Sequence, residues 1–296
     1  MANILSCVKN HIRFWVQLLF SAVTNGYAAG FLQGKIYRGT GKNFCLPGLN
    51  CYSCPGALGS CPIGAFQAVA GSRNFKFAFY VTGFLLFAGA LLGRFVCGWL
   101  CPFGLLQDIL YKIPFIQKRK RLPGDSWLKY LRYAFLALFV IVLPITALDI
   151  GGQGQPWFCK YICPSGMVMG ALPLLAANEQ LRGALGWLFT WKMVLLLLLL
   201  LLALWVYRPF CRYLCPLGAV YGFFNKAAVF RYQVDESLCV RCGQCQEACD
   251  FGIDVYRNPN SSECIRCGKC KKACPVSAIR MSAADKKEKK NAVPFL

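Results

Sequence analysis

Eight cysteines near the C-terminus follow one spacing twice, and this is the most specific chemical signal in the chain. In each copy three cysteines stand three residues apart and a fourth follows four residues later: Cys239, Cys242, Cys245 and Cys249, then Cys264, Cys267, Cys270 and Cys274. Three thiolates at this spacing can bind one [4Fe-4S] cluster, while the displaced fourth reaches a neighbouring cluster. We therefore expect one cluster on Cys239, Cys242, Cys245 and Cys274, and a second on Cys264, Cys267, Cys270 and Cys249.

Zinc is the alternative metal for these eight thiolates. Zinc sites usually consist of two CxxC pairs with a longer spacer, and they need neither a third regular cysteine nor a displaced fourth. The spacing therefore favours iron–sulfur clusters. A segment this short has little apolar core, so we expect it to fold only with its clusters bound.

A second motif, Cys-x3-Cys-Pro-x-Gly, occurs three times upstream. Its cysteine pairs are Cys97 and Cys101, Cys159 and Cys163, and Cys211 and Cys215. Residues i and i+4 lie on one face of a helix, so the two thiols of a pair can converge before the proline ends or bends the helix. Two thiolates are half of a four-thiolate site, so we expect two motifs to complete each site together. Buried packing cysteines are the alternative interpretation.

A fourth Cys-Pro-x-Gly, which begins at Cys61, lacks the partner cysteine and has Ala57 in its place. Three other cysteines precede it in the same loop: Cys45, Cys51 and Cys54. We expect Cys61 to act as the second cysteine of the motif and Cys54 to substitute for the first. Cys51 or Cys45 could displace one of these ligands, and a Cys45–Cys51 disulfide is possible in an oxidising compartment.

Long apolar stretches surround these motifs. Those at 12–33, 75–96, 128–148 and 187–207 match the length of about 20 residues that crosses a bilayer. The apolar stretches after each Cys-Pro-x-Gly are shorter, and we expect re-entrant or interfacial helices there, which are tolerated where protein buries the irregular backbone. The loops on one side hold 14 Lys and Arg and those on the other hold 7, so the positive-inside rule places both termini in the cytoplasm.

This topology selects which motifs form a site. Cys97/Cys101 and Cys211/Cys215 follow the second and fourth spans, so they meet at the cytoplasmic face. Cys159/Cys163 follow the third span and lie at the outer face. The loop with Cys54 and Cys61 is the remaining source of cysteines at that face, and we expect it to complete the outer site.

Composition limits the class of protein. The chain has 296 residues, 57% of them hydrophobic, and a formal net charge of +21, a combination typical of apolar spans with basic flanks. Nucleic-acid binding is not expected, because Lys and Arg stand beside apolar runs and in the final tail rather than on a folded polar face. A single histidine excludes bis-histidine haem. We expect a membrane domain over 1–231, a ferredoxin domain over 232–282 and a basic tail over 283–296.

Several spans, repeated Cys-x3-Cys-Pro motifs and a C-terminal double-cluster run occur here in one chain. In this combination the chain resembles the NapH/NosR-type membrane polyferredoxin family. The resemblance implies electron transfer between the quinone pool or a cytoplasmic donor and a redox protein on the outer side, and for some members the maturation or activation of a partner reductase. The extra cysteine loop and the third motif exceed the simplest members, which implies a different outer partner such as a flavoprotein.

We therefore expect a mainly α protein of the cytoplasmic membrane, in contact with lipid, with about four transmembrane helices, re-entrant or interfacial helices and a small α+β ferredoxin domain. Two [4Fe-4S] clusters belong in the ferredoxin domain and two in the membrane domain. The chain would be an electron-transfer subunit rather than a self-contained enzyme. A redox-sensing or maturation factor for a partner reductase is the alternative.

Overall fold

The computed structural model describes residues 2–72, 78–113, 117–147, 149, 154–183 and 185–283, with the backbone alone at 2–11 and 78. From residue 284 onward the expected basic tail lies outside the described residues. The protein is mainly helical, with one two-stranded sheet. The predicted fold class is confirmed to this extent.

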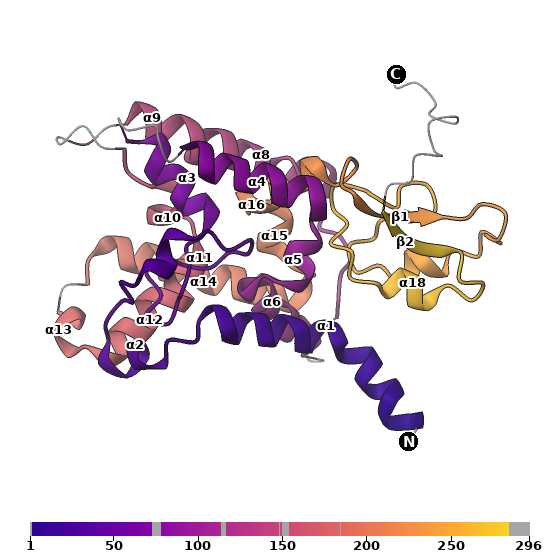
Figure 1. Ribbon diagram of the computed structural model, residues 1–296, viewed down its shortest axis with the longest axis horizontal. Helices are drawn as coiled ribbons and strands as arrows, with labels where there is room; N and C mark the ends of the chain where they lie inside the picture. Colours follow the sequence, from indigo (N-terminus) through magenta and orange to yellow (C-terminus); the bar gives the residue numbers. More distant parts are fainter. Residues whose placement is uncertain are drawn as a thin grey trace.

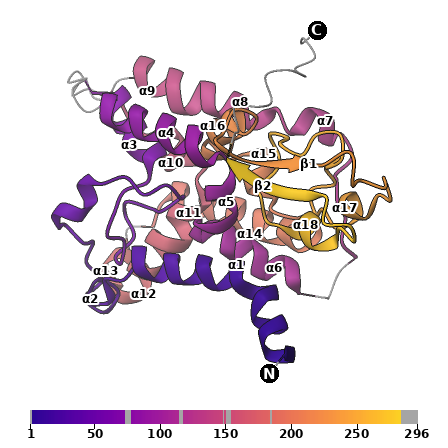
Figure 2. The same cartoon turned by 45° about the vertical axis from the view of Figure 1, so that its right-hand side comes forward.

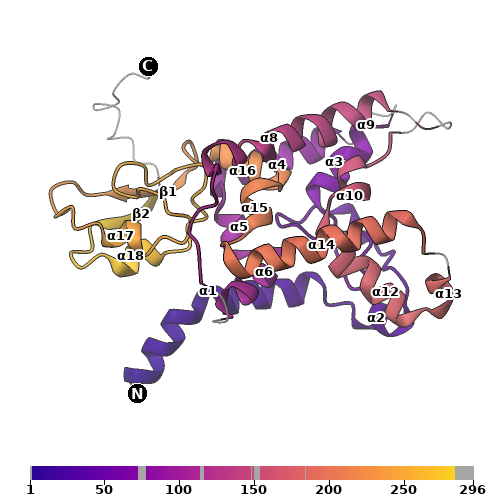
Figure 3. The same cartoon turned by 180° about the vertical axis from the view of Figure 1, so that it is seen from behind.

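Long helices run along the longest axis of the molecule, and loops and short helices occupy its two ends (Figure 1). These helices are α1 (Ala2–Thr24), α4 (Ala78–Leu92), a nearly continuous run of α7 (Asp125–Leu128), α8 (Leu131–Phe135), the π-helical segment η3 (Leu136–Val142) and α9 (Leu143–Thr146), and finally α14 (Trp187–Trp205). Seen from behind, α14 lies beside the shorter helix α6 (Pro102–Lys112) (Figure 3).

Two of these stretches are long and apolar enough to cross a membrane: Asp125–Thr146, with a mean hydropathy of 1.8, and Trp187–Trp205, with 2.3. In each, only 17% of the most apolar window is buried inside the protein. The apolar side chains therefore face outward, as a lipid-exposed helix requires. These two stretches correspond to the expected spans at 128–148 and 187–207.

The other two expected spans differ from the prediction. Among the residues with described side chains, the apolar helix of the first covers Ile12–Thr24 and that of the second Phe79–Leu92. Helix α1 as a whole has 23 residues, whereas α4, with 15, is shorter than the roughly 20 residues of a full crossing. In the first, the chain leaves the helix at Asn25 and resumes it in α2 (Ala28–Gln33). In the second, Gly93 has a φ of 51°, a left-handed conformation that ends helices. Within the described residues, two spans rather than four are clear.

Each Cys-Pro-x-Gly begins a short helix, as predicted. Proline occupies the first turn, where its missing N–H costs nothing, and the cysteine before it is extended. The four helices are α3 (Pro62–Ala70), α6, the run of α11 (Pro164–Gly166), η4 (Met167–Ala171) and α12 (Leu172–Ala177), and α16 (Pro216–Phe224). None of these described helices reaches the length of a membrane crossing.

The first cysteine of each Cys-x3-Cys pair lies in a separate short helix. These are α5 (Phe95–Trp99), α10 (Trp157–Tyr161) and α15 (Pro209–Tyr213). The helix ends before the second cysteine, so the two thiols do not share one regular helix face as expected. Loop elements complete this part: α2, the 3-10 turn η1 (Thr40–Asn43) and α13 (Glu179–Arg182).

The C-terminal part is a small unit at one end of the bundle (Figure 2). Strands β1 (Phe230–Val234) and β2 (Ile279–Ala283) pair antiparallel, with Tyr232 opposite Met281. They join the residues before the first cysteine run to those after the second. Between them lie α17 (Gln244–Glu247) and α18 (Lys269–Ala273). The same end of the bundle carries α5, α6, α15 and α16, whereas α3, α10, α11 and α12 lie toward the other end (Figures 1 and 2).

Candidate metal centres

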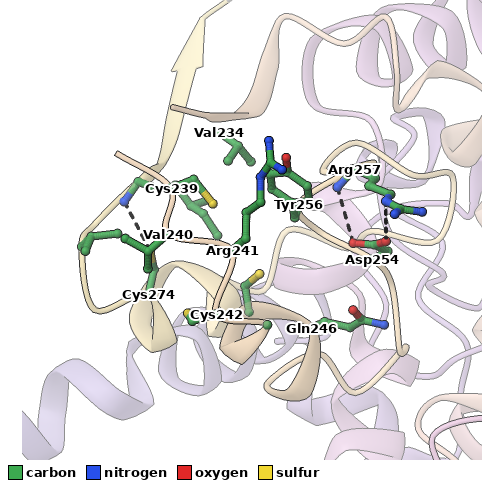
Figure 4. A pocket seen from close by; sticks show the side chains of 15 residues that line it. Val234, Cys239, Val240, Arg241, Cys242, Gln246, Asp254, Tyr256, Arg257 and Cys274 are labelled. Atoms are coloured by element: carbon green, nitrogen blue, oxygen red, sulfur yellow. Dashed lines mark hydrogen bonds and ion pairs between the residues drawn. The ribbon is translucent and has the colours of Figure 1, made fainter. Parts of the chain in front are cut away.

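The first C-terminal cysteine group lines one cavity of about 420 Å³ (Figure 4). It contains the four cysteines expected together, namely Cys239, Cys242, Cys245 and Cys274. The Cys274 sulfur accepts a hydrogen bond from the backbone N–H of Ala278 at 3.3 Å. Cys242 is exposed, so this group lies at the surface of the protein.

The second C-terminal group contains Cys249, Cys264, Cys267 and Cys270, as expected. The Cys270 thiol interacts electrostatically with the other three. Burial raises the pKa of Cys264 and of Cys270 to about 12. The protein alone would therefore keep these thiols protonated, and bound iron would be needed to stabilise the thiolates.

The two C-terminal groups share one loop geometry. Arg241 and Arg266 occupy the same position of the two Cys-x2-Cys loops, and both have a φ of 53°. Gly243 and Gly268 follow with φ values of 77° and 84°. A left-handed arginine is unusual, so its occurrence in both loops shows that the sequence repeat is also a structural repeat.

The third group, which we call the inner group, unites two membrane motifs. Its members are Cys97, Cys101, Cys211 and Cys215, each no more than 5% exposed. Cys215 interacts electrostatically with the other three, and Cys211 with Cys101. The expected topology had predicted this pairing.

The fourth group, the outer group, combines the other intact motif with the irregular loop. Cys51, Cys61, Cys159 and Cys163 line a cavity of about 750 Å³. Cys159 interacts electrostatically with the other three. The Cβ position of Gly64 lies 3.7 Å from the Cys159 sulfur, and that of Gly166 lies 3.8 Å from the Cys51 sulfur. In the outer group, the glycine of each Cys-Pro-x-Gly thus stands beside a sulfur contributed by the partner segment.

Cys54, expected in the outer group, does not line its cavity. Its sulfur lies 3.5 Å from Oδ1 of Asn25. Cys51 takes the place that the sequence assigned to Cys54. Cys45 is buried and forms an isolated parallel β-bridge with Ser60. It does not line the cavity either. Both Cys45 and Cys51 are free thiols, so the two are not joined by a disulfide.

Helix N-termini surround both membrane groups with N–H donors. The four Cys-Pro-x-Gly cysteines are the N-caps of α3, α6, α11 and α16, and among them the Cys215 sulfur accepts a hydrogen bond from the backbone N–H of Gly218. For Cys215 and Gly218 the donor–acceptor distance is 3.4 Å. An N-cap acceptor of this kind satisfies a free helix N–H and suits a negatively charged ligand.

Buried arginines adjoin the inner group. Arg94 and Arg208 are fully buried. Arg94 donates to the carbonyl oxygen of Cys211 at 2.8 Å, and Arg208 donates to that of Cys97. Asp108 accepts from Arg208 at 2.6 and 2.7 Å, and Glu263 forms an ion pair with Arg94 at 3.4 Å. Buried charges are tolerated when they are paired in this way.

The second C-terminal group packs directly on the inner group. A Cβ on Gly98, next to Cys97, would stand 2.3 Å from the carbonyl oxygen of Ile265, next to Cys264. Only glycine permits this approach. The Trp99 indole N–H donates to the Arg266 carbonyl at 3.0 Å, and Asn225 donates to the Cys264 carbonyl at 2.9 Å.

One tyrosine connects the inner and outer groups. Tyr221 in α16 is fully buried, and its hydroxyl donates to the carbonyl of Pro47 at 2.9 Å. Its side chain interacts electrostatically with Cys97 and Cys101 of the inner group and with Cys61 of the outer group. The cysteine groups therefore follow one another through the molecule.

The donor set fits iron–sulfur clusters. Every group offers four sulfurs, and soft thiolate ligands favour such clusters or zinc. Within the described ranges, no three side chains of His, Cys, Asp or Glu are gathered closely enough to hold a single metal ion. Four thiolates in each group match the ligand number of a [4Fe-4S] cluster.

Comparisons with known families agree with this donor chemistry. A family model described as a 4Fe-4S binding domain matches residues 77–123, 131–176 and 187–234. A second model with the same description matches residues 232–253 and 258–280. The matches cover three of the four membrane-domain Cys-Pro-x-Gly motifs and both C-terminal runs.

Several proteins are similar to this chain over most of its length. An uncharacterized protein of Methanocaldococcus jannaschii, MJ0750, is 31% identical over 67% of this chain and 75% of its own length. Regulatory protein NosR of Pseudomonas aeruginosa is 30% identical over 60% of this chain but only 24% of its own length. Ferredoxin-type protein NapH of Haemophilus influenzae is 28% identical over 59% of this chain and 53% of its own length. No solved structure matches the chain.

Proposed function

Since this chain belongs to the NapH/NosR-type polyferredoxin family of 4Fe-4S electron-transfer proteins, we propose that it conducts electrons across a membrane through four [4Fe-4S] clusters. The observation that carries the proposal is the succession of four cysteine groups. The first C-terminal group adjoins the second through the contact of α17 with α18. Gly98 and Ile265 bring the second group against the inner group, and Tyr221 lies between the inner and outer groups.

The ligand sets follow from these groups. Two clusters are assigned to the C-terminal part as the sequence predicts. The inner cluster is assigned to Cys97, Cys101, Cys211 and Cys215, and the outer cluster to Cys51, Cys61, Cys159 and Cys163. Here Cys51 replaces the Cys54 of the sequence prediction.

The chain itself would hold the clusters and control their environment. When bound, each cluster supplies a one-electron couple. The cysteines would anchor it, each Cys-Pro-x-Gly cysteine at a helix N-terminus, and the Gly218 N–H donates to the Cys215 sulfur. Burial excludes water, and Arg94 and Arg208 place positive charge beside the inner group, which offsets the net negative charge of four thiolates.

We propose four crossings with both termini in the cytoplasm. The two clear spans are Asp125–Thr146 and Trp187–Trp205. Helices α1 and α4 run along the same axis (Figure 1), and local thinning of the bilayer would let the shorter helix α4 complete a crossing. The C-terminal part would then face the cytoplasm and the 45–61 loop the outer side of the cytoplasmic membrane.

The partners follow from this orientation. The first C-terminal group, which lies at the surface, would accept electrons from a cytoplasmic donor. Alternatively, quinone would supply electrons to the chain within the membrane. The outer group would serve an outer-face redox protein, such as a flavoprotein or reductase. The chain would then be one subunit of an electron-transfer system rather than a complete enzyme.

Iron and acid-labile sulfide counting, combined with EPR of the anaerobically purified full chain, tests the proposal. Four clusters of four irons predict about sixteen irons per chain, together with reduced-cluster signals beyond those of the C-terminal pair. A count of about eight irons, with signals from the C-terminal clusters alone, would rule out conduction across the membrane.

A further inference from the structure

The two membrane cysteine groups contain the same buried glutamine. Gln67 stands six residues after Cys61, and Gln107 stands six residues after Cys101. The sequences are therefore Cys-Pro-x-Gly-x-x-Gln in both cases. The other two Cys-Pro-x-Gly motifs have Met169 and Tyr221 at this position, so each membrane group has one glutamine.

The two side chains make the same contacts. Nε2 of Gln107 donates to the Cys211 sulfur at 3.1 Å, and Oε1 accepts from the backbone N–H of Phe210 at 3.2 Å. Nε2 of Gln67 donates to the Cys159 sulfur at 3.3 Å, and Oε1 accepts from the N–H of Phe158 at 3.0 Å. In both groups the glutamine thus reaches from one segment to the first cysteine of the partner motif and to the residue before it.

These contacts fix which way each amide points. A backbone N–H can only donate, so the atom that faces Phe210 or Phe158 must be the oxygen. The nitrogen is then forced toward the sulfur. The second proton of the nitrogen points to the backbone carbonyl one helical turn earlier. Nε2 of Gln107 lies 3.4 Å from the Phe103 oxygen, and Nε2 of Gln67 lies 3.2 Å from the Ile63 oxygen. Both side chains are nearly inaccessible, with 2% exposure for Gln107 and none for Gln67, so water does not compete for these bonds.

We infer that Gln67 and Gln107 are positioning residues that raise the reduction potentials of the outer and inner clusters, respectively. The inference rests on the proposed function, because it needs a cluster in each group. An N–H directed at a ligand sulfur stabilises negative charge on it, and the reduced cluster carries one more negative charge than the oxidised cluster. Hydrogen bonds to sulfur and burial are recognised controls of cluster potential.

The test is EPR-monitored redox titration of the full chain carrying Gln107→Met or Gln67→Met. Methionine keeps the length and burial of the side chain and removes the amide. Gln107→Met should lower the midpoint potential of the inner cluster, and Gln67→Met should lower that of the outer cluster. Each variant should leave the midpoint potential of the other cluster unchanged. We expect the ratio of reduced to oxidised cluster at the wild-type midpoint to fall about tenfold, which corresponds to about 59 mV for a one-electron couple.

Gln17 provides the matched control. It is also fully buried beside the inner group, but its Nε2 donates to the carbonyl oxygen of Cys101 at 2.7 Å rather than to a sulfur. Gln17→Met should move the inner potential much less than Gln107→Met. An equal shift would show that loss of any buried amide suffices, and would overturn the inference. So would unchanged potentials in glutamine variants that retain about sixteen irons, whereas a wild-type count of about eight irons refutes the proposed function instead.

A second measurement needs no variant, in case either substitution prevents cluster insertion. Wild-type chain made by cell-free synthesis with glutamine labelled with ¹⁵N at Nε2 should show a ¹⁵N coupling to the reduced membrane clusters in pulsed EPR. The absence of this coupling at both clusters would overturn the inference.

Discussion

Cys51 and Cys54 belong to one loop but lie in different surroundings, and backbone contacts made elsewhere determine this. The backbone N–H of Tyr27 donates to the carbonyl of Gly56 at 3.2 Å, and a Cβ on Gly56 would collide with the Phe31 ring. The end of the loop is thereby fixed against the α1–α2 junction. Cys54 consequently faces Asn25, and Cys51 lines the outer cavity.

A pair of serine variants tests this assignment. Cys51→Ser should remove the outer-cluster EPR signal and lower the iron count from about sixteen to about twelve per chain, because a hydroxyl is a poor replacement for a thiolate ligand. Cys54→Ser should preserve both the signal and the count. The reverse result would return Cys54 to the ligand set.

At the level of residues, cysteine spacing predicted the two C-terminal groups and the expected topology predicted which membrane motifs come together, and the structure brings those cysteines together. It could not choose between Cys51 and Cys54, since the choice depends on the contact of Gly56 with residues some thirty positions earlier in the chain. Gln67 and Gln107 were also missed. The repeated Cys-Pro-x-Gly-x-x-Gln pattern is visible in the sequence, but an isolated glutamine in an apolar helix gives no reason to expect a bond to sulfur.

At the level of elements, one acidic side chain joins the C-terminal part to the helices. Glu263 is buried and forms ion pairs with Arg94 at 3.4 Å and Arg132 at 2.6 Å. The arginines come from α8 and from the turn before α5. Glu263 therefore connects three segments of the chain next to the inner group.

Glu263→Gln should loosen this connection. It would leave two buried guanidinium groups without their counter-charge, and breaking a buried pair in this way costs about 3–5 kcal/mol. We expect faster proteolysis of the full chain between α16 and β1 and a lower temperature for loss of cluster absorbance in detergent. Glu247→Gln, which changes an exposed acid of the C-terminal part, is the control and should behave as wild type. Equal protease resistance in both variants would contradict the role of Glu263.

Elements were predictable to the extent that composition determines them. The run "MVLLLLLLLLALWV" is apolar throughout and lies in α14 and its C-terminal end. By contrast, the expected span at 12–33 is broken after Thr24 and the span at 75–96 is interrupted at Gly93. Window hydropathy averages over such breaks, whereas one left-handed residue or an early helix end changes the path of the backbone.

At the level of the whole molecule, the proposed orientation predicts opposite access at the two ends. Phe44, in the loop before the outer group, is 66% exposed, and Glu236 is exposed in the C-terminal part. A membrane-impermeant maleimide should label Phe44→Cys in intact spheroplasts. It should label Glu236→Cys only after the membrane is opened. Labelling of Glu236→Cys in intact cells would reverse the orientation.

The interleaving of ligands also constrains how the protein is made. Each membrane group takes cysteines from two distant segments, so the outer group is complete only once Cys163 has been synthesised and the inner group only after Cys215. At about 5–20 residues per second, translation separates these events by several seconds. If the inner group holds a cluster as proposed, Cys97 and Cys101 must remain reduced and unoccupied until Cys211 and Cys215 have been synthesised. Under the proposed cluster assignment, biogenesis would therefore depend on the timing of translation as well as on the supply of iron and sulfide.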